Sequence, residues 1–177
     1  MGAEAFKRLR GMRSHDAIRD LKTWTNGWCT SDRFHASVRL PCLFGCIDAV
    51  DKQAHYCMCP NLFTILSYLW QPVEDISSDP ICRLGLQGTS IIRLKAVACT
   101  FSAYHHIKFN HAARFGAHGD LSPTQPLTRD VQFALLGSFA EVFRTEAFEL
   151  GCHARCFDPD DYEAFASSLS AISEASI

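Results

Sequence analysis

Three cysteines and a histidine stand at a spacing that would let them share one metal ion. Between Leu40 and Pro60 the order is C-x3-C-x8-H-x3-C, formed by Cys42, Cys46, His55 and Cys59. Thiolates and imidazoles are the ligands of tetrahedral structural zinc sites. The close cysteine pair would supply one edge of the tetrahedron, and Gly45 provides a residue that adopts positive φ at little cost. The sequence therefore predicts a Zn²⁺ site, and we call residues 40–60 the knuckle.

The second half of this motif predicts the start of a helix. His55 and Cys59 are four residues apart, so they share a face if a helix begins there, and Cys57 is left as a spare thiol. Tyr56 and Leu62 are expected to pack beneath the site. Because protein side chains fill all four positions, the predicted zinc is structural and performs no hydrolysis. The alternative is a set of buried thiols that act as small apolar side chains beside a core histidine.

The elements that must position this site are mainly helical. Apolar residues recur at three- and four-residue steps, which predicts helices over 4–24 (interrupted at Gly11 and Ser14), 61–69, 90–115 and 127–150. Gly151 is placed to end the last of these. A short helix is expected from Thr30 to Phe34, and Asp158-Pro159 opens a final one. The predicted fold class is a small, mainly α domain with one zinc knuckle, in which pieces around Val38–Leu43 form a short hairpin before a helix.

The chain divides into three parts by composition and pattern. We expect basic N-terminal helices and the zinc knuckle over 1–70, a loop over 71–89 and a helical region over 90–177. The pattern leaves open whether this last region packs on the knuckle or forms its own bundle. The 177 residues carry a net charge of −2, which is not that of a basic nucleic-acid coat.

The positive charge is concentrated near the N-terminus. Residues 1–40 hold eight Lys/Arg against four acids. A surface that faces phosphates is therefore expected at this end of the chain. The candidate nucleic-acid-binding residues are Arg8, Arg10, Arg13, Arg33 and Arg39, with Trp24, Trp28 and Phe34 as candidate stacking partners for bases. The alternative is that the charges are ordinary solvated helix faces.

The residues around the predicted ligands carry a family resemblance. The matching residues are Thr30-Ser31-Asp32-Arg33-Phe34, Cys42, Cys46, His55-Tyr56 and Cys59-Pro60. Together they resemble the zinc-binding tail of reverse transcriptases from non-LTR retrotransposons. In that family a short helix with Thr and Arg precedes a close cysteine pair, and a helix with His-x-x-x-Cys-Pro follows. A looser likeness to reading frames that carry this tail extends to about residue 115. The family's usual pair is C-x2-C, whereas this chain has C-x3-C.

The resemblance implies a tail fragment without polymerase activity. A reverse transcriptase needs a pair of metal-binding aspartates in its palm, and Asp160-Asp161 is better interpreted as first-turn acids of a helix. We therefore expect no enzyme, a Zn²⁺ cofactor and RNA or DNA as the partner that the resemblance implies. The alternative is a protein-interaction or degenerate structural module that binds no nucleic acid. The sequence indicates no small-molecule substrate and leaves the oligomeric state open.

Other clusters of reactive residues fit less well. Cys152 and Cys156 form a second C-x3-C, which would need a distant histidine such as His111 or His118. The adjacent pair His105-His106 points in directions about 100° apart on a helix, so these side chains are expected to be ordinary core or surface histidines.

The N-terminal residues and the cysteine content predict a compartment. The N-terminus lacks the apolar segment of a secretory signal, and no segment is apolar enough to span a bilayer. The nine cysteines are then expected to bind metal more than to form disulfides. We expect an intracellular protein, nuclear or cytoplasmic and not secreted, with no membrane association.

Overall fold

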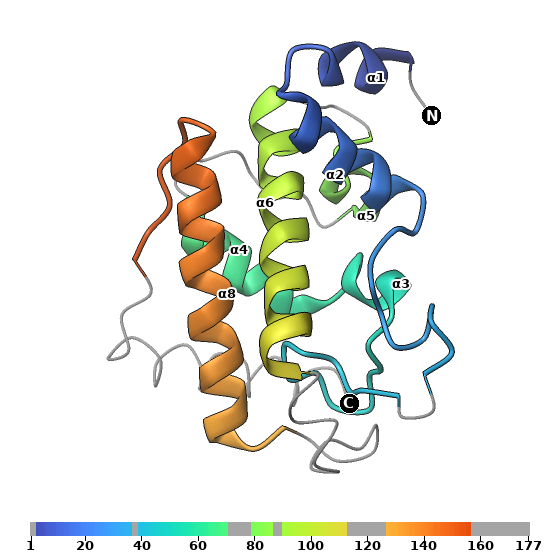
Figure 1. Cartoon of the computed structure of the whole chain (residues 1–177), viewed down its shortest axis with the longest axis vertical. Helices are drawn as coiled ribbons and strands as arrows, with labels where there is room; N and C mark the ends of the chain where they lie inside the picture. The colour runs from blue at the N-terminus through green and yellow to red at the C-terminus, as the bar shows by residue number, and fades with distance from the viewer. Residues whose placement is uncertain (1–2, 37–38, 71–78, 87–89, 113–126, 157–177) are drawn as a thin grey trace.

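Two long helices, α6 (Ile91–Ile107) and α8 (Arg129–Glu149), run side by side in opposite directions at the centre of the fold (Figure 1). The fold was obtained as a computed structural model, which describes residues 3–36, 39–70, 79–86, 90–112 and 127–156. The other described elements are α1 (Ala3–Leu9), α2 (Ser14–Trp24), α3 (Gln53–Tyr56), α4 (Pro60–Leu69), α5 (Pro80–Arg83) and the π-helical turn η1 (Lys108–Ala112). The fold is mainly helical, as predicted.

The ends of the two central helices are set by local side-chain and backbone hydrogen bonds. The Ser90 hydroxyl accepts the backbone N–H of Arg93 at the start of α6, and Thr128 caps α8 in the same way. After α8 the chain turns at Gly151, whose φ is +69°, while the N–H of Cys152 donates to the Ala147 carbonyl. This left-handed glycine ends the helix as the sequence predicted.

The predicted break in the N-terminal helix is confirmed. α1 and α2 are separate helices that meet around Gly11, and α2 packs on α6. Arg19 on α2 reaches α8, where its two Nη atoms donate to the Glu146 carboxylate at 2.6 and 3.1 Å. The paired hydrogen bonds link α2 to α8, in addition to its packing on α6.

One hydrophobic core joins the knuckle to the central helices. Leu43 and Phe44 of the knuckle are fully buried, and the Phe44 ring meets the Phe139 ring of α8 edge to face at 5.2 Å. Trp28 packs on Tyr104 of α6, with ring centroids 4.5 Å apart. The helices after residue 90 therefore pack directly on the knuckle, which answers the question that the sequence left open.

Two local expectations were wrong. The segment from Thr30 to Phe34 forms hydrogen-bonded turns and no helix, because the chain bends away at His35, whose φ is +49°. The expected loop over 71–89 contains α5, which Asp79 caps by accepting the N–H of Ile81 and which has Pro80 at its first position.

One expected element is smaller than predicted, and two others fall wholly or partly outside the described residues. Of the expected hairpin around 38–43, residue 38 lies outside the described residues, and the described part forms one antiparallel bridge, between Pro41 and Val50. The helix expected from Asp158 lies outside the described residues, as does the end of the one expected over 90–115. Within the described ranges, no helix is both long and apolar enough to cross a membrane.

Candidate metal centre

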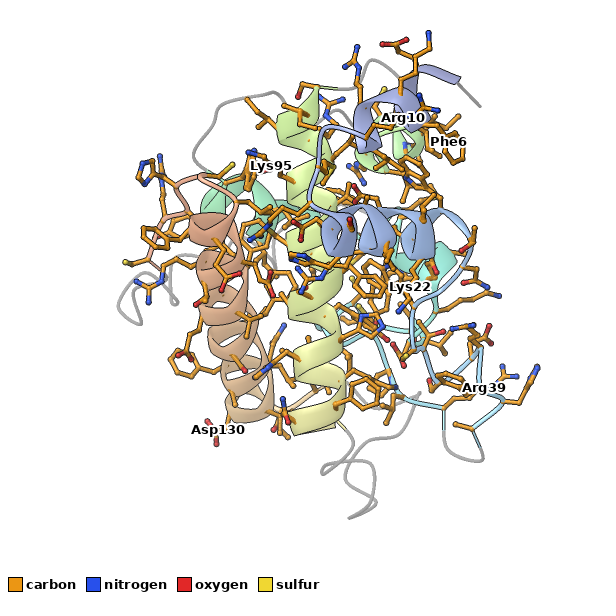
Figure 2. All side chains as sticks on the ribbon, turned by 45° about the horizontal axis from the view of Figure 1, so that its top comes forward. Phe6, Arg10, Lys22, Arg39, Lys95 and Asp130 are labelled. Atoms are coloured by element: carbon orange, nitrogen blue, oxygen red, sulfur yellow. The ribbon has the colours of Figure 1, made fainter. Side chains whose placement is uncertain are left out.

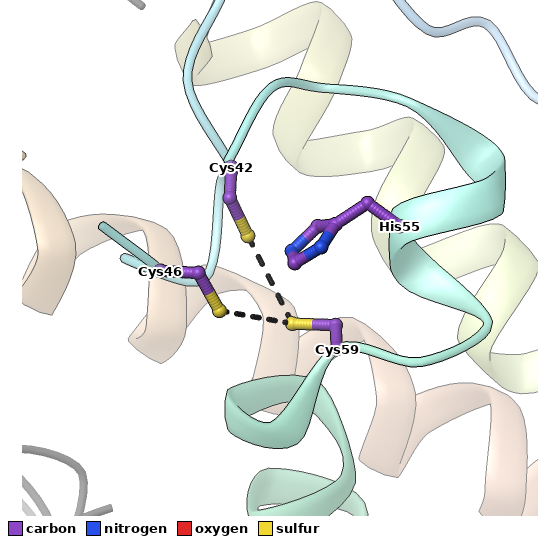
Figure 3. Close-up of side chains that lie close together, drawn as sticks. All are labelled: Cys42, Cys46, His55 and Cys59. Atoms are coloured by element: carbon purple, nitrogen blue, oxygen red, sulfur yellow. Dashed lines mark hydrogen bonds between the residues drawn. The ribbon is translucent and has the colours of Figure 1, made fainter. Parts of the chain in front are cut away.

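The four predicted ligands converge on one point. The ligand atoms of Cys42, Cys46, His55 and Cys59 all lie within 4.8 Å of one another (Figure 3). The Sγ atom of Cys59 lies 3.4 Å from that of Cys46 and 3.8 Å from that of Cys42. Two thiolates bound to one tetrahedral zinc at about 2.3 Å are separated by about 3.8 Å. The sulfur separations are therefore those of a group that can close around a single ion.

The histidine supplies an independent observation. His55 Nε2 is buried and has no hydrogen-bond partner among the residues that the structure describes. An unpaired buried nitrogen of this kind is costly, and native structures rarely leave one without a partner. Figure 3 shows the imidazole directed toward the cysteine sulfurs. A bound cation would satisfy this nitrogen, so the donor set and its geometry fit zinc.

The first two ligands are positioned by the backbone of the knuckle. The Cys42 N–H donates to the Ala49 carbonyl at 2.6 Å, and the Gly45 N–H donates to the Cys42 carbonyl at 3.0 Å, which closes the tight turn. Gly45 has a φ of +80°, and a Cβ atom at this position would lie 2.0 Å from Nε2 of Gln132 on α8. The turn therefore favours glycine for its positive φ, whereas the contact with the flexible end of the Gln132 side chain could be relieved by a side-chain movement.

The second pair of ligands is held differently from the prediction. His55 lies on α3, which ends at Tyr56, whereas Cys59 is the N-cap residue of α4, so they share no helix face. The reason is Pro60, because a residue before proline is driven out of the helical region, and Cys59 has a ψ of 112°. The Cys59 sulfur accepts the N–H of Leu62. The N-terminus of α4 thus favours negative charge on this sulfur.

The three thiols affect one another's pKa values. Hydrogen bonds from the thiols of Cys42 and Cys59 lower the pKa of Cys46. Burial raises the pKa of Cys42 and of Cys59 above the ordinary thiol value. Without a cation, one thiolate would therefore be stabilised by two protonated neighbours, and binding of a metal would release protons from the cluster.

A buried aspartate that the sequence analysis missed connects this centre to α6. Asp51 is fully buried, and its Oδ1 accepts hydrogen bonds from the hydroxyls of Tyr56 at 2.8 Å and Tyr104 at 2.7 Å. Its Oδ2 accepts the backbone N–H of Ser31 at 2.7 Å and is also paired with Lys108. Three of its four partners lie 20, 53 and 57 residues away in the sequence, so no local spacing reveals the network. The segment between the two ligand pairs holds two acids, Asp48 and Asp51, and nothing in the sequence shows which of them is buried.

We predict that the Asp51→Ala substitution lowers the free energy of unfolding by about 3–5 kcal/mol, because it leaves the largely buried Lys108 ammonium and two buried hydroxyls without an acceptor. Urea denaturation measures this change. Asp32→Ala is the matched control, since Asp32 makes only partly exposed ion pairs with Arg39 and Lys52, at 3.8 and 3.7 Å. Equal effects of the two substitutions would contradict the role assigned to Asp51.

The five candidate arginines do not form one surface. Arg8 pairs with Glu4 at 3.5 Å, and Arg13 pairs with the buried Asp16 at 2.8 Å. Figure 2 shows Arg10 beside α1 and Arg39 on the knuckle side of the molecule, far from each other. Arg39 directly precedes the knuckle in the sequence, and Nη1 of Arg33 donates to the Trp28 carbonyl at 3.5 Å.

The three candidate stacking residues differ in how buried they are, and the remaining histidines and thiols of the described ranges form no metal site. Trp28 belongs to the core and Trp24 is half-buried, whereas the Phe34 side chain is 60 % exposed. His105 packs on the Phe101 ring and accepts the N–H of Cys29 at Nε2, as a core histidine does. Cys152 and Cys156 join no metal-binding group in the described part of the chain, and His118 lies outside it.

Comparison with known proteins identifies no relative of this chain. No protein-family model, no curated protein and no solved structure matches the chain.

Proposed function

We propose that this chain is a structural zinc-binding domain, in which one Zn²⁺ held by Cys42, Cys46, His55 and Cys59 fixes the knuckle against the central helices. The observation that carries the proposal is the convergence of three sulfurs and one unpaired buried imidazole nitrogen within 4.8 Å. Four protein ligands leave no open position for water or substrate, so the proposed ion has a structural role and performs no hydrolysis. We also propose, from the sequence, that the domain is not an enzyme.

The metal content of the purified protein tests this proposal. We expect elemental analysis to find about one zinc per chain, and Co²⁺ substitution to give the intense visible absorption of a tetrahedral thiolate site. The double substitution Cys42→Ser and Cys59→Ser should abolish both. Cys57→Ser is the control, because this half-buried thiol lies in the same segment but outside the cluster. Absence of zinc from the wild-type protein, prepared without chelator, would overturn the proposal.

The resemblance to retrotransposon reverse-transcriptase tails stays a prediction from the sequence. Its support is the order of the ligands, together with the proline after Cys59. This residue, Pro60, is the first residue of α4. We propose on this basis that the knuckle derives from such a tail, without the polymerase.

A second candidate function, binding of single-stranded nucleic acid, rests on one exposed pair of side chains. The guanidinium of Arg33 lies over the exposed Phe34 ring, 5.3 Å from its centroid, and Arg39 is also exposed. An exposed aromatic ring beside arginine is the arrangement on which bases stack while the backbone meets positive charge. The ion pairs of Arg8 and Arg13 argue instead for a protein-interaction or structural module.

Salt dependence distinguishes these two functions. If nucleic acid binds at the Phe34 pair, affinity for oligothymidylate should fall steeply with salt, and Arg33→Ala should reduce the slope of log K against log[salt] by about 0.7. Fluorescence anisotropy at several salt concentrations measures both quantities. Arg144→Ala, a change of an exposed arginine on α8, should leave them unchanged. If the affinity does not depend on salt, or if the two substitutions have equal effects, nucleic-acid binding at this pair is excluded. The protein-interaction or structural module is then the remaining candidate.

A further inference from the structure

The three cysteine ligands of the proposed metal centre differ in how far solvent reaches them. Cys42 and Cys59 are fully buried, whereas Cys46 is partly exposed. The two residues that follow it, Ile47 and Asp48, are both exposed, so this ligand lies at the surface of the knuckle. Among cysteines that bind the same ion, exposure decides which sulfur a dissolved oxidant reaches first. Cys46 is therefore the ligand that is open to attack from solvent.

A second sulfur lies close enough to form a disulfide with the exposed one. The Sγ atoms of Cys46 and Cys59 are 3.4 Å apart, and a disulfide bond brings two such atoms to about 2.05 Å. Bond formation therefore requires an approach of only about 1.4 Å. The Sγ atom of Cys42 lies farther from that of Cys59, at 3.8 Å (Figure 3). Cys46 and Cys59 are thus the pair that combines exposure with close approach.

We propose that the metal centre is a redox switch, in which hydrogen peroxide oxidises Cys46 and Cys59 to a disulfide and zinc is released. This inference rests on the proposed zinc site and concerns the regulation of that site. The zinc keeps its charge throughout, because the electrons come from the two sulfurs. The oxidised knuckle then differs from the zinc-bound one in its ligands and in its stability.

The reaction has two steps, both of which start from a thiolate, since a thiol that coordinates zinc is deprotonated. The Cys46 sulfur attacks one peroxide oxygen, so that an S–O bond forms, the O–O bond breaks, and the departing hydroxide takes a proton from solvent. The Cys59 sulfur then attacks the sulfenic sulfur, so that the S–S bond forms, the S–O bond breaks, and a second hydroxide takes a proton. The two sulfurs lose two electrons in total, and the peroxide gains them and becomes two water molecules.

Oxidation leaves too few ligands to hold the ion. Only Cys42 and His55 remain, whereas a structural zinc site uses four protein ligands. The buried Nε2 atom of His55 then lacks a partner among the described residues. The sulfur of Cys59, now part of a neutral disulfide, accepts the N–H of Leu62 at the start of α4 less strongly than a thiolate does. Both changes destabilise the knuckle, so oxidation should have the same structural effect as removal of zinc by a chelator.

Treatment of the zinc-loaded chain with hydrogen peroxide tests the switch. Elemental analysis measures the zinc content beforehand, and a chromogenic zinc indicator follows the release. We expect peroxide to release about one zinc per chain. Peptide mapping by mass spectrometry should find a disulfide between Cys46 and Cys59. Dithiothreitol with added Zn²⁺ should restore both the zinc content and the near-ultraviolet circular dichroism.

Three substitutions locate the reactive sulfur. Cys46→His keeps two cysteines and two histidines, a ligand set that zinc accepts, and removes the exposed thiol, so peroxide should release zinc at least about tenfold more slowly. Cys57→Ser and Cys156→Ser are the matched controls, because they remove a half-buried and an exposed thiol that lie outside the ligand group. Both controls should release zinc at the wild-type rate.

The possible results separate the switch from the zinc site itself. Absence of zinc before peroxide is added would overturn the proposed function and the switch together. Zinc that stays bound in peroxide, or that leaves without a disulfide between Cys46 and Cys59, would overturn the switch alone. If Cys46→His holds no zinc, the disulfide mapped in the wild-type chain decides.

Discussion

Removal of the metal is expected to unfold the knuckle and to lower the thermal unfolding temperature by at least about 10 °C. Binding of structural zinc is worth about 10–16 kcal/mol in small zinc domains, which equals or exceeds the whole stability of an ordinary domain. For a chain of this size each kcal/mol corresponds to about 2–4 °C in unfolding temperature. Circular dichroism during heating, with and without a chelator, measures the shift, and added Zn²⁺ should reverse it.

The effect should spread beyond the four ligands, because the knuckle is part of the common core. Phe44 packs on Phe139 of α8, and Tyr56 shares the Asp51 carboxylate with Tyr104 of α6. Loss of the knuckle would expose these rings to water, at about 1.5–3 kcal/mol for each large apolar side chain. We therefore expect the near-ultraviolet circular dichroism of the aromatic residues to collapse together with the knuckle.

Cys57→Ser separates the metal from the general effect of losing a thiol. This variant should keep the wild-type unfolding temperature and its response to the chelator, since Cys57 lies outside the ligand group. If the chelator removes the metal, as elemental analysis would verify, and the unfolding temperature does not change, the four side chains are packed thiols and a core histidine without a structural ion.

The cluster of candidate metal ligands and the main helices were predictable because both depend on residue patterns that are local in the sequence. The four ligands lie within one segment, so their spacing alone indicated the site. α6 and α8 follow from recurring apolar residues and from Ser90 and Thr128 at their starts. The sequence analysis did not predict that Cys59 is the N-cap residue of α4. Pro60 could have indicated this, because proline disfavours the helical conformation of the residue before it.

Buried charge was not predictable, because it depends on partners that are distant in the sequence. The acids of α2 have the spacing of an ordinary solvated helix face, yet Asp16 and Asp20 are fully buried in the structure. Arg19 pairs with Glu146 across 127 residues of sequence, and Asp51 with Tyr104 across 53, so both contacts depend on how the helices pack. A hydrophobic pattern can show which face of a helix is apolar but not which polar residue is covered by another element.

Asp20 gives the second large prediction, because its carboxylate is buried without a hydrogen-bond partner among the described residues. Burial, and then the charge of Asp16 one helical turn away, raises the pKa of Asp20 from 3.8 to about 8. Its neighbour differs sharply, since the Asp16 carboxylate contacts Arg13 at 2.8 Å, His15 at 3.0 Å and Arg19 at 3.1 Å. The folded protein therefore holds Asp20 protonated at neutral pH.

The sign of the resulting pH dependence follows from proton binding. Below pH 3.8 the carboxyl is protonated in both the folded and the unfolded chain, so its contribution to stability is complete. As the pH rises from 3.8 toward about 8, the unfolded chain loses this proton and the folded chain keeps it, so stability decreases with pH. Above about 8 both states are ionised and the loss levels off. At pH 7 the loss is on the order of 4 kcal/mol.

Asp20→Asn should remove this loss, because the amide has the shape of the protonated carboxyl and does not ionise. We expect the variant to be more stable than the wild type by several kcal/mol at pH 7–8, with a difference that shrinks toward pH 5. Urea denaturation between pH 5 and pH 9 measures the difference, in which the titration of other groups cancels. His105 is one such group, since burial lowers its pKa and reduces stability at acidic pH instead. Asp16→Asn gives the opposite contrast and should destabilise, because it leaves cations without their buried partner. It also removes the charge that helps to raise the pKa of Asp20, so its own pH dependence should be weaker. A pH-independent difference between the wild type and Asp20→Asn would show that Asp20 is ionised in the folded chain.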